Sequence, residues 1–277
     1  MNSYWLKAGL VAWVVLGVLA PHRSHAEESA LKPLTTGDAS RGWEGVGRIN
    51  LGNTGFCTGA LIAPDLVLTA AHCLFDKVTG ERVPVDSMEF LAGWRNGRAA
   101  AYRGVRRAIE HPDYRFGESD RIDRVASDLA LLQLDQPIRN AGIAPFATDV
   151  RPMVGDVIEV VSYAQDRADA ASLQEQCHVM GQRSGVLVLT CQVGFGSSGA
   201  PVFTLKDGVA RIVSVISAKA EVDGSEVALA TDLTRPLARL RDEMAASGGA
   251  RHLAQRSAPS VLTGTGGAGS VAKFVKP

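Results

Sequence analysis

Thr69-Ala70-Ala71-His72-Cys73 follows directly on the apolar run Leu61-Ile62-Ala63-Pro64-Asp65-Leu66-Val67-Leu68. The run predicts a strand that ends near the histidine, and the adjacent cysteine can tether the chain there. An imidazole that is held in place, with a pKa near neutrality, can act as a general acid and base. If His72 acts in this way, the chain should also supply a nucleophile and an orienting carboxylate.

Two later runs contain such groups. Ser127-Asp128-Leu129-Ala130-Leu131-Leu132-Gln133-Leu134 places an aspartate at the head of an apolar segment, and Gly194-Phe195-Gly196-Ser197-Ser198-Gly199-Ala200-Pro201 places two serines among glycines. A carboxylate that is buried without a partner is costly, so the position of Asp128 predicts a partner for it. The chain order His, Asp, Ser is one of the orders in which the serine hydrolase triad occurs.

From Trp43 to Leu240 the sequence resembles the trypsin/chymotrypsin-like serine peptidases, in their bacterial exported form. The resemblance rests on the three runs above, and on Phe56–Ile62 and His111-Pro112-Asp113-Tyr114. It implies two six-stranded antiparallel β-barrels followed by a C-terminal helix. His72 and Asp128 would come from the first barrel and Ser198 from the second. Without the resemblance, the short apolar stretches between Gly, Pro, Asp and Asn turns predict only an all-β protein.

The resemblance also implies the role of each residue. Ser198 would be the nucleophile, His72 the base and then the acid, and Asp128 the carboxylate that fixes the histidine tautomer. The N–H groups of Gly196 and Ser198 would form the oxyanion hole. Ser197 is the competing nucleophile, but the family's glycine spacing favours Ser198.

The ends of the chain predict segments outside the folded unit. Residues 1–26 have a basic Lys7, an apolar middle and Ser24-His25-Ala26, which indicates a signal peptide, with a retained membrane anchor as the alternative. An N-terminal arm at 27–42, a peptidase domain at 43–246 and a flexible Gly/Ala/Ser-rich tail at 247–277 would follow. Within the domain we expect barrels at about 43–136 and 145–231, and a helix at about 234–246 that is capped by Thr234.

Charge and cysteine content limit the partners. Loss of Lys7 and Arg23 with the signal peptide changes the net charge from zero to −2, which does not favour nucleic acid or a membrane surface. We expect a monomer, periplasmic or secreted, that acts on proteins or peptides without a cofactor. The four cysteines of an exported chain predict disulfides, although free buried thiols remain an alternative. No Cys-x-x-Cys or His-x-x-x-His spacing suggests a metal site.

Four cysteines allow three pairings, and the resemblance selects Cys57–Cys73 and Cys177–Cys191. The sequence departs from the digestive enzymes of the family at Ser197, where those enzymes have an aspartate that receives a new N-terminal ammonium after cleavage. The arm also lacks the Ile-Val-Gly-Gly start. We therefore expect activity without any cleavage beyond removal of the signal peptide.

The residues expected in the specificity pocket also differ from those of the family's well-known members. Gln192 stands where trypsin-type enzymes have an aspartate, and Ile216 stands where glutamyl-specific relatives have a histidine. Phe195 would lie at the pocket mouth and Ser217 beside the triad, whereas Lys219 and Glu226 would narrow the pocket. The expected preference at P1, the residue before the cleaved bond, is for small or apolar side chains.

The sequence thus predicts a serine endopeptidase that forms an acyl-enzyme on Ser198. A catalytically silent protein of the same fold, which binds other proteins, is the alternative. An esterase is a further possibility, although an α/β-hydrolase has a different chain order and long crossover helices.

Overall fold

The computed structural model describes residues 30–118 and 121–256. The predicted signal peptide, the first residues of the arm and the end of the tail lie outside these ranges. Among the described residues, no helix is both long and apolar enough to cross a bilayer.

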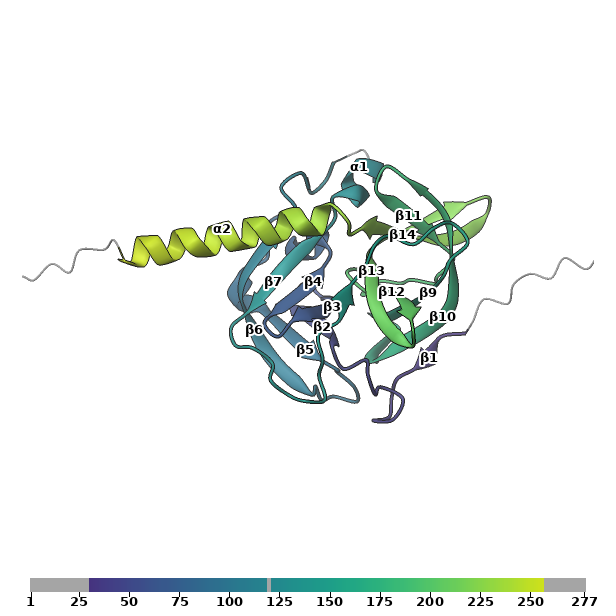
Figure 1. The fold of residues 1–277 in the computed structure, drawn as a ribbon, viewed down its shortest axis with the longest axis horizontal. Coiled ribbons are helices and arrows are strands. Elements are labelled where there is room, and N and C mark those ends of the chain that lie inside the picture. Colours follow the sequence, from purple (N-terminus) through teal and green to yellow (C-terminus); the bar gives the residue numbers. More distant parts are fainter. Residues whose placement is uncertain (1–29, 119–120, 257–277) are drawn as a thin grey trace, which may run out of the picture.

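The first half of the chain forms a closed six-stranded barrel (Figure 1). Its strands are β2 (Val46–Leu51), β3 (Phe56–Ala63), β4 (Leu66–Thr69), β5 (Met88–Ala92), β6 (Ala101–Glu110) and β7 (Ala130–Leu134), paired in the order β2-β3-β4-β7-β6-β5. The short 3₁₀ helices η1 (Ala71–Leu74) and η2 (Val85–Ser87) lie between β4 and β5. Side chains from four of its strands, Ile49, Leu61, Phe90 and Leu132, are fully buried, so the barrel is filled by a packed apolar core.

The second half forms a second antiparallel ring. Its strands are β9 (Val157–Ala164), β10 (Arg167–Arg183), β11 (Val186–Leu189), β12 (Pro201–Lys206), β13 (Val209–Val222) and β14 (Ser225–Asp232). The order is β10-β11-β14-β13-β12-β9, and pairing of β9 with β10 closes the ring. The short β8 (Ala147–Thr148) adds in parallel to β13. The predicted fold class, two six-stranded β-barrels, is confirmed.

An aromatic cluster joins the two barrels. Trp43 precedes β2, Phe146 lies in the connection between the barrels, and Phe203 belongs to β12. The Phe203 ring lies 5.0 Å from the Trp43 ring and 4.8 Å from the Phe146 ring, both in edge-on contact. Such contacts fix one barrel against the other, and the site described below depends on that placement.

One predicted strand is divided in the structure. The run Leu61–Leu68 was expected to be continuous, but β3 ends at Ala63 and β4 begins at Leu66. Pro64 lacks an N–H and, with Asp65, makes the turn of a hairpin. The prediction of one strand was wrong, because both arms of the hairpin are equally apolar.

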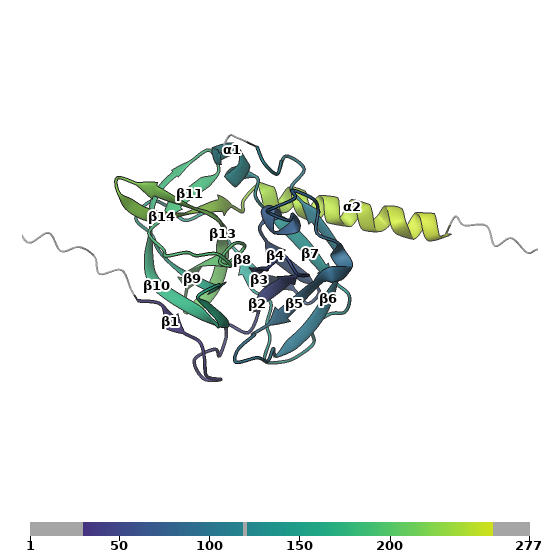
Figure 2. The ribbon, with the colours of Figure 1, turned by 180° about the vertical axis from the view of Figure 1, so that it is seen from behind.

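The N-terminal arm is more ordered than its polar sequence suggests. Its residues 32–33 form β1 (Lys32–Pro33), which pairs with β10 and lies along it in Figures 1 and 2. The next residue, Leu34, is buried and donates its N–H to Ala171 O at 2.8 Å. The arm therefore packs on the second barrel as part of the fold.

Two helices accompany the barrels: α1 (Arg121–Ala126) and α2 (Pro236–Arg256). Leu237, Leu240 and Met244 of α2 are buried, and the helix then runs past the first barrel, away from the body (Figure 1). It ends about ten residues beyond the expected position, because residues 247–256 contain no proline to stop it. Thr234 is not its cap: the Thr234 hydroxyl instead donates to the Asp232 carboxylate at 2.7 Å.

Candidate active site

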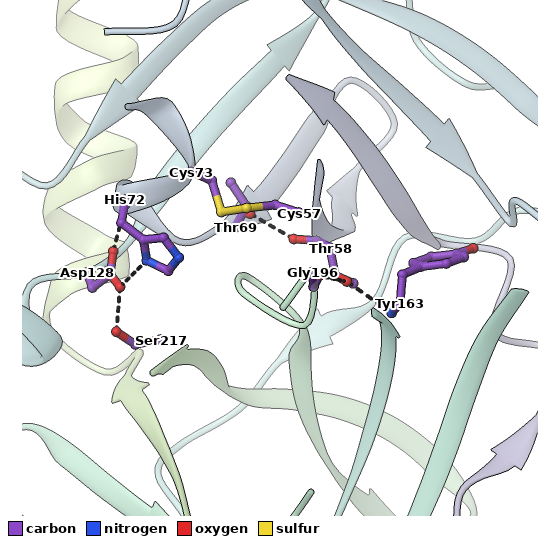
Figure 3. Close-up of a disulfide and its surroundings, with 9 residues drawn as sticks. All are labelled: Cys57, Thr58, Thr69, His72, Cys73, Asp128, Tyr163, Gly196 and Ser217. Carbon is purple, nitrogen blue, oxygen red and sulfur yellow. Dashed lines mark hydrogen bonds and ion pairs between the residues drawn. A yellow bond between two sulfur atoms is a disulfide. The ribbon is translucent and has the colours of Figure 1, made fainter. Parts of the chain in front are cut away.

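His72 is held by Asp128 through two hydrogen bonds (Figure 3). The histidine lies in η1, directly after β4, and its backbone N–H donates to Asp128 Oδ1 at 2.8 Å. Its ring Nδ1 lies 2.6 Å from Asp128 Oδ2. The aspartate side chain is 3% exposed and the imidazole 16% exposed, so that the carboxylate is enclosed and the ring still reaches solvent.

Asp128 receives a third hydrogen bond from the other barrel. The hydroxyl of Ser217, on β13, donates to the same Oδ2 atom that faces the imidazole (Figure 3). The aspartate itself lies between α1 and β7, where its N–H donates to Val125 O at 3.2 Å. The burial that the sequence predicted for Asp128 is therefore compensated by three donors.

The serine-bearing run forms a tight turn between β11 and β12. Within it, Ser197 N–H donates to Gly194 O at 3.0 Å and Gly199 N–H to Ile216 O at 2.8 Å. In the part of the chain that the structure describes, the N–H groups of Gly196 and Ser198 donate to no protein acceptor. The two donors that were predicted to bind an oxyanion are thus left available in this turn.

Gly199 allows the turn to approach the end of β4. Its φ is +79°, and a Cβ built there would lie 2.1 Å from Thr69 Oγ1 and 2.3 Å from Thr58 O. Only glycine fits both this backbone conformation and this contact. The glycine therefore brings Ser198 toward the strand that leads into His72.

Thr58 connects the first barrel to the serine turn, a role that the sequence did not indicate. Its N–H donates to Ser198 O at 2.8 Å, and its hydroxyl donates to Gly196 O at 2.8 Å. The same hydroxyl accepts from Tyr163 N at 3.1 Å, and Thr69 Oγ1 donates to Thr58 O at 2.8 Å (Figure 3). One threonine thus links the serine turn with the strands on either side.

Ser198 is half-buried, whereas the adjacent Ser197 is fully buried. The Ser197 hydroxyl contacts Tyr163 O at 3.1 Å, so it points into the protein. The Ser198 hydroxyl makes no hydrogen bond among the described residues. A nucleophile-to-base hydrogen bond often tightens only when substrate binds, so this geometry is compatible with Ser198 acting on a substrate.

The structure forms the two disulfides that the resemblance implied. Cys57 and Cys73 are joined with their Cα atoms 6.3 Å apart, and Cys177 and Cys191 with theirs 5.2 Å apart. The first bond ties η1 to β3 beside His72. Ligand atoms of Cys57, Cys73 and His72 lie within 4.8 Å of one another, but both sulfurs are committed to the disulfide and offer no thiolate to a metal.

A pocket of about 460 Å³ lies on the second barrel, beside the serine turn. Gln192 and Lys219, both predicted to bind substrate, line it, as does Glu226, which forms a 2.5 Å ion pair with Lys219. Phe195 was expected at the mouth of this pocket. It instead lines a separate pocket of about 190 Å³ with His72, because the turn directs its ring, 76% exposed, toward the first barrel.

A family model described as a trypsin-like peptidase domain matches residues 57–210, which is more than half of the chain. The chain belongs to this family, and the class predicted from the sequence, a trypsin-like serine peptidase, is confirmed.

Individual relatives agree with this class. The chain is 26% identical over 152 residues to "Glutamyl endopeptidase" of Bacillus licheniformis, which covers 54% of this chain and 45% of that protein. It is 36% identical over 83 residues to "Modular serine protease" of Drosophila melanogaster, which covers 29% of this chain and 13% of that protein. The chain thus spans less than half the length of either relative.

A solved structure, described as a Glu endopeptidase in complex with MPD, superimposes with a TM-score of 0.65 and 18% identity. The match covers 79% of this chain and 98% of that one. At this identity the likeness bears on the fold alone.

Proposed function

We propose that this protein is an exported serine endopeptidase that hydrolyses peptide bonds through an acyl-enzyme on Ser198. His72 is the general base and acid, Asp128 the orienting carboxylate, and the N–H groups of Gly196 and Ser198 form the oxyanion hole. Membership of the trypsin-like family supports the class of reaction. The residue roles are supported by the geometry of the site.

The observation that carries this proposal is the double contact between Asp128 and His72. The carboxylate accepts from the backbone N–H at 2.8 Å and faces Nδ1 at 2.6 Å. It therefore favours the tautomer with the proton on Nδ1, which leaves Nε2 as the base. The same carboxylate stabilises the imidazolium that forms when Nε2 takes a proton.

The reaction follows from these positions. Ser198 Oγ attacks the substrate carbonyl while Nε2 of His72 accepts the hydroxyl proton, and the C–N bond of the tetrahedral intermediate then breaks as His72 returns that proton to the leaving amine. Water, deprotonated by the same nitrogen, then attacks the ester carbonyl, and the bond to Ser198 Oγ breaks as His72 returns the proton to that oxygen. Each free N–H of the turn that reaches the oxyanion contributes about 3 kcal/mol to the transition state.

The substrates would be proteins or peptides that bind with P1 in the pocket beside the turn. Gln192 makes one wall of that pocket neutral, and Lys219 and Glu226, which form an ion pair, also line it. These features support the expected preference for small or apolar P1 residues. We further propose a monomer that acts in the periplasm or outside the cell, for which the two disulfides are suited.

Labelling with a fluorophosphonate tests the proposal, because this reagent reacts with activated serines. The wild type should be labelled, Ser198→Ala should lose the label, and Ser197→Ala should still react, although more slowly. A folded wild-type protein that takes no label would contradict the proposed activity and would favour a silent binding protein.

A further inference from the structure

A charged side chain lies behind the serine turn. Arg167 is the first residue of β10, immediately after the turn that joins β9 to β10. Its guanidinium donates to Ser162 O at 2.5 Å, to Ser162 Oγ at 3.0 Å and to Ser197 Oγ at 3.3 Å. It therefore links the neighbouring hairpin directly to the residue before Ser198.

Arg167 completes the hydrogen bonding of a fully buried hydroxyl. Ser197 Oγ accepts from Gly194 N–H at 3.3 Å and from Arg167, and it can donate its single proton to Tyr163 O at 3.1 Å or to Ser162 Oγ at 3.4 Å. A hydroxyl has one proton and two lone pairs, and all three are used here. Loss of the guanidinium would remove one of the two N–H donors to this buried hydroxyl.

The hairpin and the serine turn also touch through their backbones. Gln165 N–H donates to Phe195 O at 2.7 Å, and a Cβ built on Gly196 would lie 3.1 Å from Ala164 Cα. The turn thus rests against residues 164–167, and Arg167 is the side chain that fastens it there.

The guanidinium keeps its charge in this position. Burial lowers the pKa of Arg167 from its ordinary value and the nearby Asp166 acts against that change, but an arginine remains protonated in a protein. Among the described residues, no carboxylate forms an ion pair with Arg167 within 4.0 Å. No carboxylate in contact with the guanidinium therefore neutralises its positive charge. This charge lies next to the turn where an oxyanion would develop.

We propose that Arg167 is a positioning residue: by bonding Ser162 and Ser197, it fixes the turn so that the Gly196 and Ser198 N–H groups converge on the oxyanion. This inference rests on the proposed function. Because Ser197 replaces the aspartate of the digestive enzymes, the sequence predicted that no new N-terminal ammonium is needed. In its place, the guanidinium of Arg167 holds the serine turn through Ser197.

Arg167 also lines the 460 Å³ pocket, so the competing role for its guanidinium is to bind an acidic substrate side chain. The two roles predict different kinetics. Positioning lowers the rate with any reagent that uses the oxyanion hole, including one without a P1 side chain. Substrate binding lowers turnover of acidic P1 substrates only.

The test uses the full-length mature protein and a simple alkyl fluorophosphonate, whose phosphoryl oxygen enters the oxyanion hole. We expect Arg167→Gln to lower the maximal labelling rate about 10- to 100-fold, which is somewhat less than the effect of losing an oxyanion donor itself. The reagent concentration that gives half of the maximal rate should change less than about threefold. Arg167→Lys, which keeps the charge without the fork, should recover part of the rate. Arg183→Gln, exposed at the other end of β10, is the matched control and should label within about twofold of the wild type.

A double-variant cycle tests whether Arg167 acts through Ser197. If it does, Arg167→Gln combined with Ser197→Ala should lose less rate than the product of the two single losses. A purely structural effect on the barrel would instead lower the melting temperature, and the rate at saturating reagent would stay unchanged in the molecules that remain folded.

The inference would be overturned if Arg167→Gln kept the wild-type maximal labelling rate, or if only the reagent concentration at half-maximal rate changed. It would also be overturned if the rate losses of the two single variants simply multiplied in the double variant. A loss of turnover seen only for matched peptides with Glu or Asp at P1 would likewise contradict it. If Arg167→Gln does not fold, the inference is tested with Arg167→Lys instead. A maximal labelling rate of Arg167→Lys equal to that of the wild type refutes the inference. If the wild type takes no label, the proposed function itself fails, so the two failures are distinguishable.

Discussion

Asp128 is the residue on which the orientation of His72 depends. Replacement of Asp128 by Asn should lower the maximal labelling rate by about 10⁴-fold, because the amide cannot hold the productive histidine tautomer. Oxygen and nitrogen of the amide would still occupy the site between His72 and Ser217, so we expect the variant to fold. Labelling kinetics and a melting curve on the same sample measure both effects.

Asp123→Asn provides the matched control, since Asp123 is exposed on α1, five residues before Asp128. Its rate should stay within about twofold of the wild type. A rate for Asp128→Asn that is as high as that of the control would show that the carboxylate does not orient the base.

Some residues of the candidate site can be predicted from the sequence, whereas others are found only in the structure. His72, Asp128 and Ser198 stand in local runs that can be recognised without a structure. Thr58 and Arg167 do not, because their partners lie 138 and 30 residues away in the chain, at Gly196 and Ser197 respectively. Neither residue type is informative alone, so only the fold shows what they contact.

At the scale of an element, the loop after β6 contains a histidine that should make stability depend on pH. His111 is buried, its N–H donates to Leu129 O at 2.9 Å, and its Nδ1 accepts from Asp113 N at 3.3 Å. Burial lowers its pKa below the ordinary 6.5, Asp113 opposes this change, and Arg239 of α2 adds to it. The folded protein therefore binds a proton at His111 less readily than the unfolded chain does.

The direction of the effect follows from this difference. Well above pH 6.5 the imidazole is neutral in both states, and as the pH falls through 6.5 the unfolded chain takes up the proton first, so the folded state loses stability. In His111→Asn, whose amide oxygen can replace Nδ1 as the acceptor, the free energy of unfolding should fall less between pH 7.5 and pH 5. Urea unfolding at both pH values measures this, and an unchanged pH dependence in the variant would refute the assignment.

Elements were predicted unevenly, for physical reasons. Short strands with apolar residues, such as β7 and β9, are evident because their burial is nearly continuous. The long strand β10 was missed, because polar residues such as Gln174, Glu175 and Gln176 interrupt the apolar pattern that marks the shorter strands. The end of α2 was misplaced because Gly248 and Gly249 weaken a helix without stopping it.

At the scale of the whole molecule, the docked arm should stabilise the second barrel and should not block activity. A form that starts at Trp43 loses β1 and the buried Leu34, and burial of one such side chain is worth about 1.5–3 kcal/mol. Leu34→Ala should reproduce most of this loss. Lys32→Ala, which removes only an exposed ion pair with Glu175, should cost about 1 kcal/mol or less.

The form that starts at Glu27 should be labelled at its full rate without further trimming. An inert Glu27 form that becomes active only after cleavage near Arg41 or Trp43 would show that the arm is a propeptide. Unfolding curves and labelling of the two forms, measured side by side, separate these possibilities.

The central claim concerns the atom that attacks the substrate, and it is tested most directly by locating the phosphonyl group on the labelled wild-type protein. Peptide mapping by mass spectrometry, with fragmentation between Ser197 and Ser198, resolves the two adjacent hydroxyls. The proposed mechanism predicts one phosphonyl group per chain, on Ser198, and none after substitution of that residue. A group on Ser197 or elsewhere in the chain would contradict it.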